Sequence, residues 1–500
     1  MNRQTNKKIV ALPVDGRPVV REQVRQLVSI ARWDLVMPDV DQLGHFRAPA
    51  DRDALADWLL TNAVDADGFV LSLDMLIYGG LVPSRFIAEI EGALLARLSS
   101  IILLKQRYPH RHLYAFLATM RLSNNNINEE EKTYWDQYGE LIWRWSFYED
   151  RYAVLNDADD FSIANDAKRA IPAHICEDYL ATRKRNFGVA LHALSLVKNG
   201  VIDRLILPQD DTAGYGFNIA ERRLLQQRVI AENLSKRVLI YPGADEVIHT
   251  LCAHMVGVLV HQQATKFFIL PTDSANIGAL HARYEDRAVL ESIHAQIAAV
   301  GGVVVNAAMS SDVLLLVHTA GTTQGDWAMR LALPSPSTVN AQWLTEAVAG
   351  WTKKIAVLDL AYANGADPVL IAALSEVIPL NSLAGYAAWN TASNSAGSLL
   401  AQCVLANAED DANANKEAVC LRLLEDYLYQ AVMRQQIRDE IDEARMTADE
   451  LTAKVSESFI PSANQWLRQH QFDFRVASIY LPWGRTFEIG INLVSDSVSE

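Results

Sequence analysis

Short apolar runs recur along the whole chain, and each gives way to a polar, glycine-rich or aspartate-rich stretch. Most of these runs are too short to be buried helices, and several are rich in valine and isoleucine, which favours β-strands. Helix-length amphipathic stretches lie between them, for example at 219–233 and 281–300. The apolar runs lie at 8–18, 33–44, 68–80, 112–126, 203–216, 237–246, 266–276, 302–309, 312–321, 354–365 and 383–394.

This alternation predicts an α/β fold. Strands that alternate with helices are typical of βαβ units and of a mostly parallel sheet, whose strands are continuously apolar because both faces are covered. The strand candidates outnumber the eight strands of a single barrel. We therefore predict a (β/α)8-like barrel with additional elements, and doubly wound parallel α/β sheets are the alternative.

Two segments depart from the alternation. Residues 127–200 are rich in aromatic side chains with helical spacing, and they predict a helical insertion. Residues 408–470 are polar and helical in pattern, and 474–493 alternate as one or two strands would. The sequence thus predicts a catalytic domain over 1–405 that carries the insertion, followed by a C-terminal helical segment with terminal strands over 406–500.

Composition and charge limit the partners that we expect. The formal net charge of -15 argues against a nucleic-acid surface and against an anionic membrane surface. The four cysteines are far apart and match no CxxC spacing, which is typical of reduced core residues in a cytosolic protein. No apolar run reaches the ~18 residues of a membrane span, and the first residues lack the features of a signal peptide. We expect a cytoplasmic protein without a membrane or nucleic-acid partner, and a homo-oligomer stays open.

Polar side chains concentrate directly after the predicted strands. In parallel α/β folds, the carboxyl ends of the strands line the ligand sites. Each of these residues also has a structural interpretation, since an aspartate after a strand often caps the next helix and an arginine can brace a buried carboxylate. Their convergence favours a pocket. The predicted substrate-binding residues are Asp15, Arg17, Asp74, Tyr78, Arg85, Arg121, Asn124, Tyr215, Trp389, Asn390 and Asn394.

Asp210 and Asp211 stand side by side where the apolar run 205–207 ends. Two close carboxylates cannot both ionise cheaply, so the pKa of one should rise. A protonated carboxylic acid beside an ionised carboxylate is what glycoside hydrolysis requires. We therefore predict a glycoside hydrolase that acts on a small glycoside or amino sugar, with Asp210 and Asp211 as the catalytic pair in an unassigned order. The structural alternative for this pair is one helix cap and one solvated carboxylate.

Two other functions remain as alternatives. Asp15, Asp74, Asp210 and Asp211 could supply oxygen ligands for Mg²⁺ or Mn²⁺ in a lyase, isomerase or hydrolase of an acidic or phosphorylated small molecule. A non-catalytic sugar-binding or sugar-sensing protein is the third interpretation. The histidine spacings predict no zinc site, and no GxGxxG or GxxxxGK[ST] motif occurs. Our first hypothesis accordingly includes no metal and no cofactor.

Four motifs carry a resemblance to a known family. They are LPVDGRP (12–18), DMLIYGGLVPSR (74–85), AAWNTASNSAG (387–397) and PWGRTFE (482–488). Together they resemble an uncharacterised bacterial family, a domain of unknown function, over nearly the whole chain, and this resemblance implies no mechanism.

A looser similarity is to barrel hexosaminidases that use an Asp-Asp pair after a middle strand and an acetamido-assisted mechanism. It implies catalysis by Asp210 and Asp211 in a pocket lined by Tyr215, Trp389 and Asn390.

Overall fold

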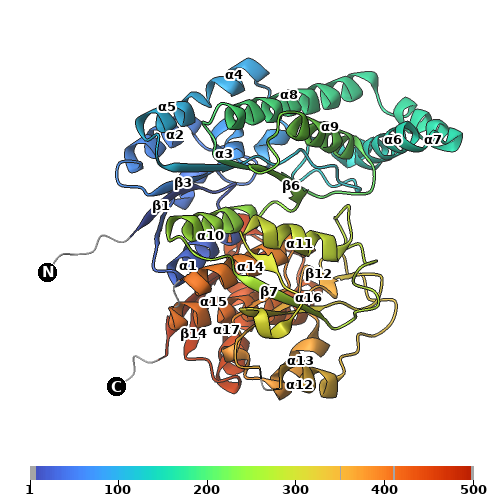
Figure 1. Cartoon of the computed structure of the whole chain (residues 1–500). Helices are drawn as coiled ribbons and strands as arrows, with labels where there is room; N and C mark the ends of the chain where they lie inside the picture. The colour runs from blue at the N-terminus through green and yellow to red at the C-terminus, as the bar shows by residue number, and fades with distance from the viewer. Residues whose placement is uncertain (1–6, 350, 409–410, 497–500) are drawn as a thin grey trace. The chain divides into compact units, whose positions relative to one another are not determined.

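The structure, a computed structural model, describes residues 7–349, 351–408 and 411–496. The chain forms two compact units that are interleaved along the sequence, and each is described by itself (Figure 1). The first unit contains Met1–Gly16, Leu35–Ile248 and Tyr284–Asp286, and the second contains Arg17–Asp34, His249–Arg283 and Arg287–Glu500. The boundary that the sequence predicts near residue 405 lies inside the second unit.

A six-stranded sheet forms the centre of the first unit in the order β2-β1-β3-β4-β5-β6. The pairs from β1 through β6 are parallel. Every residue of β3 is buried, as its continuously apolar sequence predicts. The strands are β1 (Lys8–Leu12), β2 (Asp34–Val36), β3 (Gly68–Ser72), β4 (His112–Phe116), β5 (Arg204–Gln209) and β6 (Val238–Pro242).

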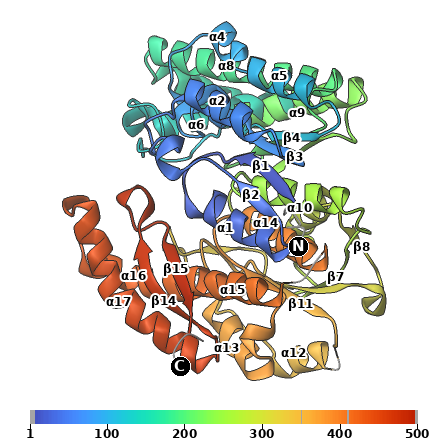
Figure 2. The same ribbon diagram turned by 90° about the vertical axis from the view of Figure 1, so that its left-hand side faces the viewer.

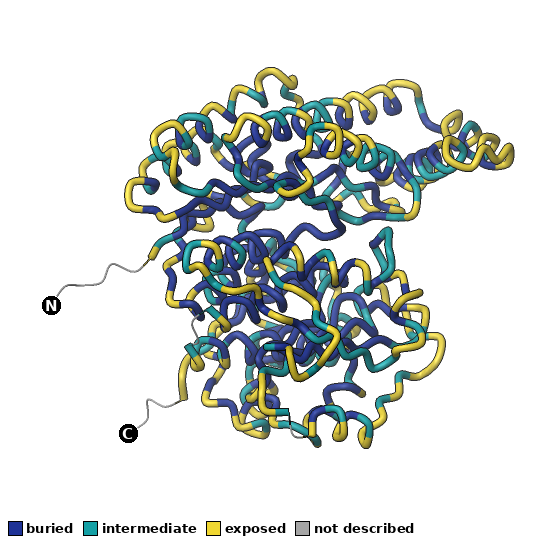
Figure 3. The backbone as a smooth tube through the Cα atoms, viewed as in Figure 1, coloured by how far each residue is buried: buried dark blue, intermediate teal, exposed yellow. Residues whose placement is uncertain are grey.

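Helices connect these strands. Asp51 caps α2 by accepting the backbone N–H groups of Asp53 and Ala54, which a helix leaves without intrahelical partners. The segment that the sequence predicts as a helical insertion contains α6, α7 and α8, and Trp135 and Trp145 of α6 belong to a hydrophobic cluster that also includes Met120 and Leu122. Figure 3 shows how buried and exposed residues are distributed along the chain. The helices are α2 (Arg52–Asn62), α3 (Leu73–Tyr78), α4 (Glu91–Ala96), α5 (Ser99–Arg107), α6 (Trp135–Leu155), α7 (Ala158–Arg169), α8 (Ala173–Lys198) and α9 (Phe217–Ala231).

A five-stranded sheet forms the centre of the second unit in the order β13-β11-β9-β7-β8, with parallel pairs throughout. Two small sheets accompany it, parallel β10–β12 and antiparallel β14–β15. The strands are β7 (Lys266–Pro271), β8 (Val303–Val304), β9 (Val313–His318), β10 (Gly325–Asp326), β11 (Lys354–Asp359), β12 (Tyr362–Ala363), β13 (Gly385–Ala387), β14 (Phe474–Tyr480) and β15 (Gly490–Ser495).

The helices of the second unit include α17, which runs alongside the antiparallel pair β14–β15 (Figure 2). A π-helix over Leu423–Met433 fixes the PWGRTFE motif, because its Tyr429 hydroxyl donates to the Thr486 carbonyl oxygen at 2.7 Å. The helices are α1 (Glu22–Ile30), α10 (Val247–Leu259), α11 (Val289–Ala299), α12 (Ala341–Val348), α13 (Pro368–Val377), α14 (Ala392–Ala408), α15 (Ala412–Arg422), α16 (Arg434–Glu440) and α17 (Ala448–Gln469).

The predicted α/β class with parallel sheets is confirmed, but the barrel is not. Each large sheet has two different edge strands, β2 and β6 in one and β13 and β8 in the other, so neither closes on itself. The alternative of parallel α/β sheets is compatible with these orders. Read in chain order, both sheets have the arrangement 2-1-3-4-5, and the first adds a sixth strand. In such sheets, ligands bind outside the carboxyl ends of strands 1 and 3, where the order reverses.

The four cysteines are buried and form no disulfide, as the sequence predicts. In the described ranges, no helix combines the length and the apolar character that crossing a bilayer requires.

Candidate functional site

The order of the first sheet reverses between β1 and β3, so the residues that follow these strands flank the expected ligand position. Asp15 follows β1 and is buried. The backbone beside it is held by the Val14 carbonyl oxygen, which accepts the Leu81 N–H at 3.2 Å. Asp74 follows β3 and is also buried. The fold therefore places two of the predicted acids where the topology predicts a site.

Asp74 lies in the first turn of α3, which Ser72 caps by accepting the Met75 N–H. Its Oδ2 accepts the backbone N–H of Ala118 at 2.9 Å, just beyond the end of β4. Its Oδ1 is buried without a hydrogen-bond partner among the described residues. Burial raises the pKa of Asp74 to about 7, and the charge of Asp210 adds to this rise.

This raised pKa predicts a pH-dependent stability. The folded state binds the proton of Asp74 more tightly than the unfolded chain does, so the charged form costs stability, up to about 4 kcal/mol, as the pH rises from about 4 to about 7. We expect Asp74→Asn to match the wild type near pH 4 and to exceed its free energy of unfolding at pH 8. Urea unfolding at both pH values measures this difference.

The matched control is Asp53→Asn, because Asp53 has a side chain that is 90% exposed and a guanidinium partner in Arg97. The free energy of unfolding of Asp53→Asn should differ from that of the wild type by a small amount at both pH values. If the free energy of unfolding of Asp74→Asn differs from that of the wild type by the same amount at both pH values, the assignment of a buried, protonated Asp74 is wrong.

The turn after α3 positions Arg85 in the site. Gly79 has a φ of 80°, and a Cβ there would lie 2.7 Å from the Cβ of Pro49, so only glycine fits this position. Tyr78 is buried beneath the guanidinium of Arg185, and burial raises the pKa of its hydroxyl. Tyr78 therefore packs the base of this turn in the present conformation, and its predicted contact with substrate stays a prediction.

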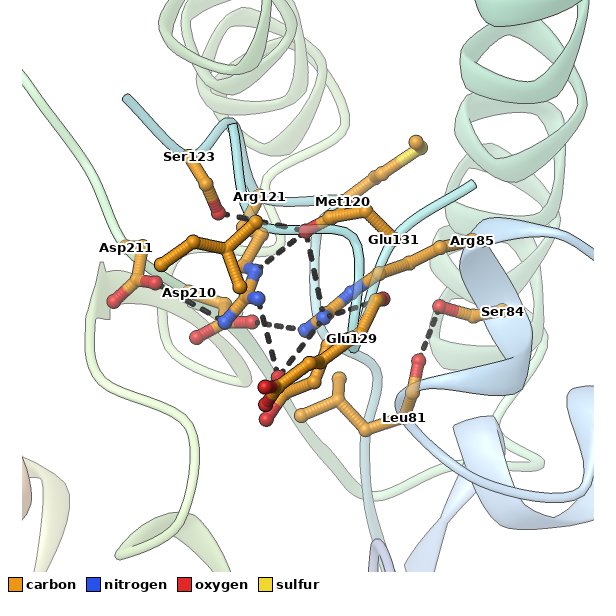
Figure 4. Close-up of polar contacts among 12 residues, drawn as sticks. Leu81, Ser84, Arg85, Met120, Arg121, Ser123, Glu129, Glu131, Asp210 and Asp211 are labelled. Carbon is orange, nitrogen blue, oxygen red and sulfur yellow. Dashed lines mark hydrogen bonds and ion pairs between the residues drawn. The ribbon is translucent and has the colours of Figure 1, made fainter. Parts of the chain in front are cut away.

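Arg85 joins the loop after β4 to the end of β5. Its Nη2 donates to Asp210 Oδ2 at 3.0 Å (Figure 4). Its Nη1 lies 3.2 Å from Glu130 Oε2. Nη1 also lies 3.5 Å from Glu131 Oε1. The Arg85 side chain is only 2% exposed, so these carboxylates replace the water that a guanidinium would otherwise bind.

Arg121 makes the parallel set of contacts. Its Nε donates to Glu131 Oε1 at 2.8 Å, its Nη2 lies 3.1 Å from Glu130 Oε2, and its Nη1 donates to Asp211 Oδ2 at 3.2 Å (Figure 4). Each aspartate of the pair thus has its own arginine, and the two arginines share Glu130 and Glu131. These six side chains form what we call the arginine–carboxylate cluster.

Asp211 is held in an unusual backbone conformation, with a φ of 38°. Residues other than glycine rarely adopt positive φ, and such strain is often found at functional sites. The next residue fixes the turn, because the Thr212 N–H donates to the Tyr284 carbonyl oxygen at 2.9 Å. Burial, together with the charge of Asp210, raises the pKa of Asp211 to about 7, although Arg121 and Arg85 oppose this rise.

A second layer of side chains positions the two arginines. Arg183 donates from Nε and Nη2 to Glu221 at 2.9 and 2.6 Å, and its Nη2 also donates to the Met120 carbonyl oxygen. Arg185 Nη2 and the Asn186 side-chain amide both donate to the Ser84 carbonyl oxygen. All three donor residues come from α8, so the helical insertion supports the backbone on which Arg85 and Arg121 stand.

The arginine–carboxylate cluster holds more acid than base. Four carboxyl groups face two guanidinium groups, and Asp74 adds a fifth carboxyl close enough to feel the charges of Asp210 and Arg85. A surplus of buried negative charge favours a bound proton. The raised pKa values of Asp74 and Asp211 agree with this, so the cluster can supply a proton near neutral pH.

A comparison with known families identifies the family of this chain. The family described as Protein of unknown function (DUF4127) matches residues 9–492, nearly the whole chain. The chain belongs to this family. No curated protein matches it.

The other predicted residues of the first unit lie less centrally in this DUF4127 protein. Asn124 lies exposed on the loop after β4. The Tyr215 ring meets Phe147 edge-on, with centroids 5.6 Å apart, so it belongs to the aromatic side chains beside α6. A role for either in binding a sugar stays a prediction.

Four predicted residues belong to the second unit. Arg17 Nη1 donates to Glu488 Oε1 at 3.1 Å, which joins the LPVDGRP motif to the PWGRTFE motif and gives Arg17 the bracing role of the structural interpretation. Trp389 is only 1% exposed and packs against Phe487, so its ring presents no free face for stacking on a sugar in this conformation. The residues predicted to line one pocket are therefore divided between the two units and do not all follow the strands of one sheet.

The asparagines of the WNTASN element shape its backbone. Asn390 has a φ of 73°, and its carbonyl oxygen accepts the Asn364 N–H at 3.0 Å. Asparagine tolerates this left-handed conformation better than most residues. Asn394 is buried in the first turn of α14, where its N–H donates to the Thr391 hydroxyl. Both residues position the junction of β13 and α14.

Sequence reasoning missed Glu130 and Glu131. They belong to an acidic run, NEEEK at 128–132, inside the segment that the sequence predicts as a helical insertion. In the structure Glu131 is buried and forms ion pairs with both Arg85 and Arg121. The sequence signal that could have indicated their role is the position of this acidic run, which lies shortly after β4 and Arg121.

The carboxylates of this cluster face guanidinium groups rather than one another. Within the described ranges, no three histidine, cysteine, aspartate or glutamate side chains converge as a metal site would require.

Proposed function

We propose that this DUF4127 protein hydrolyses a glycosidic bond in a small glycoside or amino sugar, with Asp211 as the general acid and Asp210 as its carboxylate partner. The observation that carries the proposal is the difference between two adjacent acids. Burial and the charge of Asp210 raise the pKa of Asp211 to about 7. Asp210 accepts an N–H at 3.0 Å from Arg85, which is 2% exposed, whereas Asp211 accepts one at 3.2 Å from Arg121, which is 17% exposed. A carboxyl group with a raised pKa beside a second carboxylate is the arrangement that glycosidases use as acid and partner.

The proposed reaction uses each group for one task. Protonated Asp211 donates its proton to the glycosidic oxygen as the bond to the sugar breaks. Asp210 stabilises the positive charge that develops on the sugar ring, and Arg85 keeps Asp210 in place. A water molecule then forms a bond to the anomeric carbon, and the proton that it releases restores the acid form of Asp211. Arg121 contacts Asp211 at 3.2 Å, and its positive charge keeps the pKa of Asp211 from rising further.

The charge of the cluster bears on the substrate. Its surplus of carboxylates repels an acidic or phosphorylated molecule, which is the substrate class of the metal-dependent alternative. A neutral sugar, or an amino sugar with a free ammonium group, suits this field better. We therefore propose a neutral or cationic small carbohydrate as the substrate.

The test is a panel of nitrophenyl glycosides, including those of glucosamine and N-acetylglucosamine, assayed for release of nitrophenol. We expect turnover of at least one member, with kcat/KM falling as the pH rises through about 7, because Asp211 then loses the proton it must donate. If the wild type cleaves none and Asp210→Asn and Asp211→Asn bind the same sugars as the wild type, the proposal is wrong. Binding without turnover that both variants weaken would favour the sugar-sensing alternative.

A further inference from the structure

A second strand-end cluster occurs in the second unit, at the position that corresponds to the one in the first. The order of the second sheet reverses between β7 and β9. Thr272 is the first residue after β7, and His318 is the last residue of β9. The Thr272 hydroxyl oxygen lies 2.9 Å from His318 Nδ1, and His318 Nε2 lies 2.9 Å from Asp367 Oδ2. Hydroxyl, imidazole and carboxylate thus form a continuous chain of hydrogen bonds.

The surroundings of Asp367 fix which nitrogen carries the proton. Although burial alone would raise the pKa of Asp367, hydrogen bonds from His318 and Ser337 hold it below its ordinary value. An ionised carboxylate only accepts hydrogen bonds, so His318 Nε2 must donate. In the neutral imidazole, Nδ1 is then an acceptor that faces the Thr272 hydroxyl. This is the tautomer in which a histidine can take a proton from a hydroxyl group.

The cluster is sheltered on one side and open on the other. His318 and Asp367 are each 1% exposed, and the Asp367 carboxylate is anchored by the Val369 N–H at the start of α13. Thr272 is only half-buried, and the residues that follow it, Ser274 and Ala275, are exposed. The Thr319 N–H donates to the Thr272 hydroxyl oxygen at 3.3 Å. Two acceptors face the hydroxyl proton, and His318 Nδ1 at 2.9 Å is nearer than the Thr319 carbonyl oxygen at 3.5 Å. Thr272 therefore links the buried pair of His318 and Asp367 to an exposed loop.

We propose that Thr272 is a nucleophile that accepts an acyl group from a neutral carboxylic ester, with His318 as its base and Asp367 as the residue that orients His318. The Thr272 hydroxyl oxygen forms a bond to the ester carbonyl carbon, and the bond from that carbon to the leaving oxygen breaks. The hydroxyl proton moves to His318 Nδ1 and from there to the leaving oxygen or to water.

The charges nearby favour an acyl group over a phosphoryl group. Asp273 adjoins Thr272, and the Asp359 carboxylate accepts the Asp367 N–H at 2.6 Å. Burial raises the pKa of Asp359 to about 6, so it is charged above that pH. With Asp367 these groups place a negative field around the nucleophile, which repels a phosphate ester and tolerates a neutral one.

The test is the reaction of the full-length chain with p-nitrophenyl acetate. We expect a burst of about one p-nitrophenolate for each chain and an acetyl group on Thr272 in a digest analysed by mass spectrometry. Thr272→Val keeps the shape of the side chain and should abolish the burst, whereas Thr272→Ser should retain it. His318→Gln and Asp367→Asn should slow the burst by about 100-fold or more. Ser274→Ala, in the same loop, should leave it unchanged.

Two outcomes would overturn this proposal. One is a burst of wild-type size in Thr272→Val, and the other is acetylation of lysine side chains without acetylation of Thr272. Thermal unfolding of every variant shows whether a variant without the burst is still folded. Retention of the burst in Thr272→Ser shows that a substitution at this position can leave the cluster intact.

Discussion

Replacing Arg85 with methionine is expected to lower the free energy of unfolding by about 3 to 5 kcal/mol at pH 8. The Arg85 side chain is 2% exposed, and it contacts Glu130, Glu131 and Asp210. Methionine fills much of the same volume, so the main change is the loss of a positive charge among one buried and two partly buried carboxylates. Glu131, whose side chain is 3% exposed, cannot regain water in the folded state, and its repulsion by the partly buried Glu130 and Asp210 then acts against folding.

The loss should depend on pH, and its direction follows from the same charges. Without the guanidinium, the pKa values of the neighbouring carboxyl groups rise, and the folded state binds their protons more tightly than the unfolded chain does. The destabilisation is therefore largest at high pH and shrinks as the pH falls and the carboxyl groups become protonated. Urea unfolding of the wild type and of Arg85→Met at pH 5 and pH 8 measures both effects.

A surface arginine provides the control. Arg169 has an 80% exposed side chain and lies 3.9 Å from Asp166 in the same helix, so Arg169→Met should change stability little at either pH. A loss for Arg85→Met that equals the loss for Arg169→Met would mean that the arginine–carboxylate cluster contributes nothing to the fold. A large loss that is the same at both pH values would point to packing rather than charge.

The second large effect concerns catalysis. Asp211→Asn is expected to lower kcat/KM for the best glycoside of the panel by about 10² to 10⁴-fold, the usual contribution of a general acid. Asparagine keeps the size of the side chain and can adopt the positive φ of 38° at this position. The amide can still accept a hydrogen bond from Arg121, but it has no proton to give. The change should therefore act on kcat more than on KM.

The leaving group sharpens this test. A glycoside with an acidic leaving group, such as dinitrophenol, needs little protonation, so Asp211→Asn should retain far more activity toward it than toward a nitrophenyl glycoside. Asp53→Asn is the matched control, because it alters an exposed aspartate that also pairs with an arginine. Equal losses of activity on both leaving groups would contradict the role of Asp211 as the acid.

Part of the candidate site could be predicted from the sequence. Asp74, Arg85, Arg121, Asp210 and Asp211 all follow strands that were recognised by their apolar runs, and parallel strands end at the same edge of a sheet. The structure brings these side chains together, with both arginines in contact with the Asp210–Asp211 pair. This prediction needed only the strand positions and the rule that ligands bind at carboxyl ends.

Other residues could not be found in that way. Glu131 reaches the cluster from a loop whose sequence resembles a solvated acidic helix, and only the folded loop shows that it is buried. Thr272, His318 and Asp367 are separated by up to about a hundred residues, and each has an ordinary local environment in the sequence. Trp389 has the composition of a sugar platform, yet neighbouring side chains cover it.

The sequence by itself determined the α/β class, the parallel strands and the strand ends at which polar groups gather, because hydrophobic periodicity and turn residues are local properties. Only the tertiary structure decided that the strands divide between two open sheets, and which acid meets which base. Closure of a sheet and pairing of charges depend on contacts between residues that are distant along the chain. A count of strands does not contain that information.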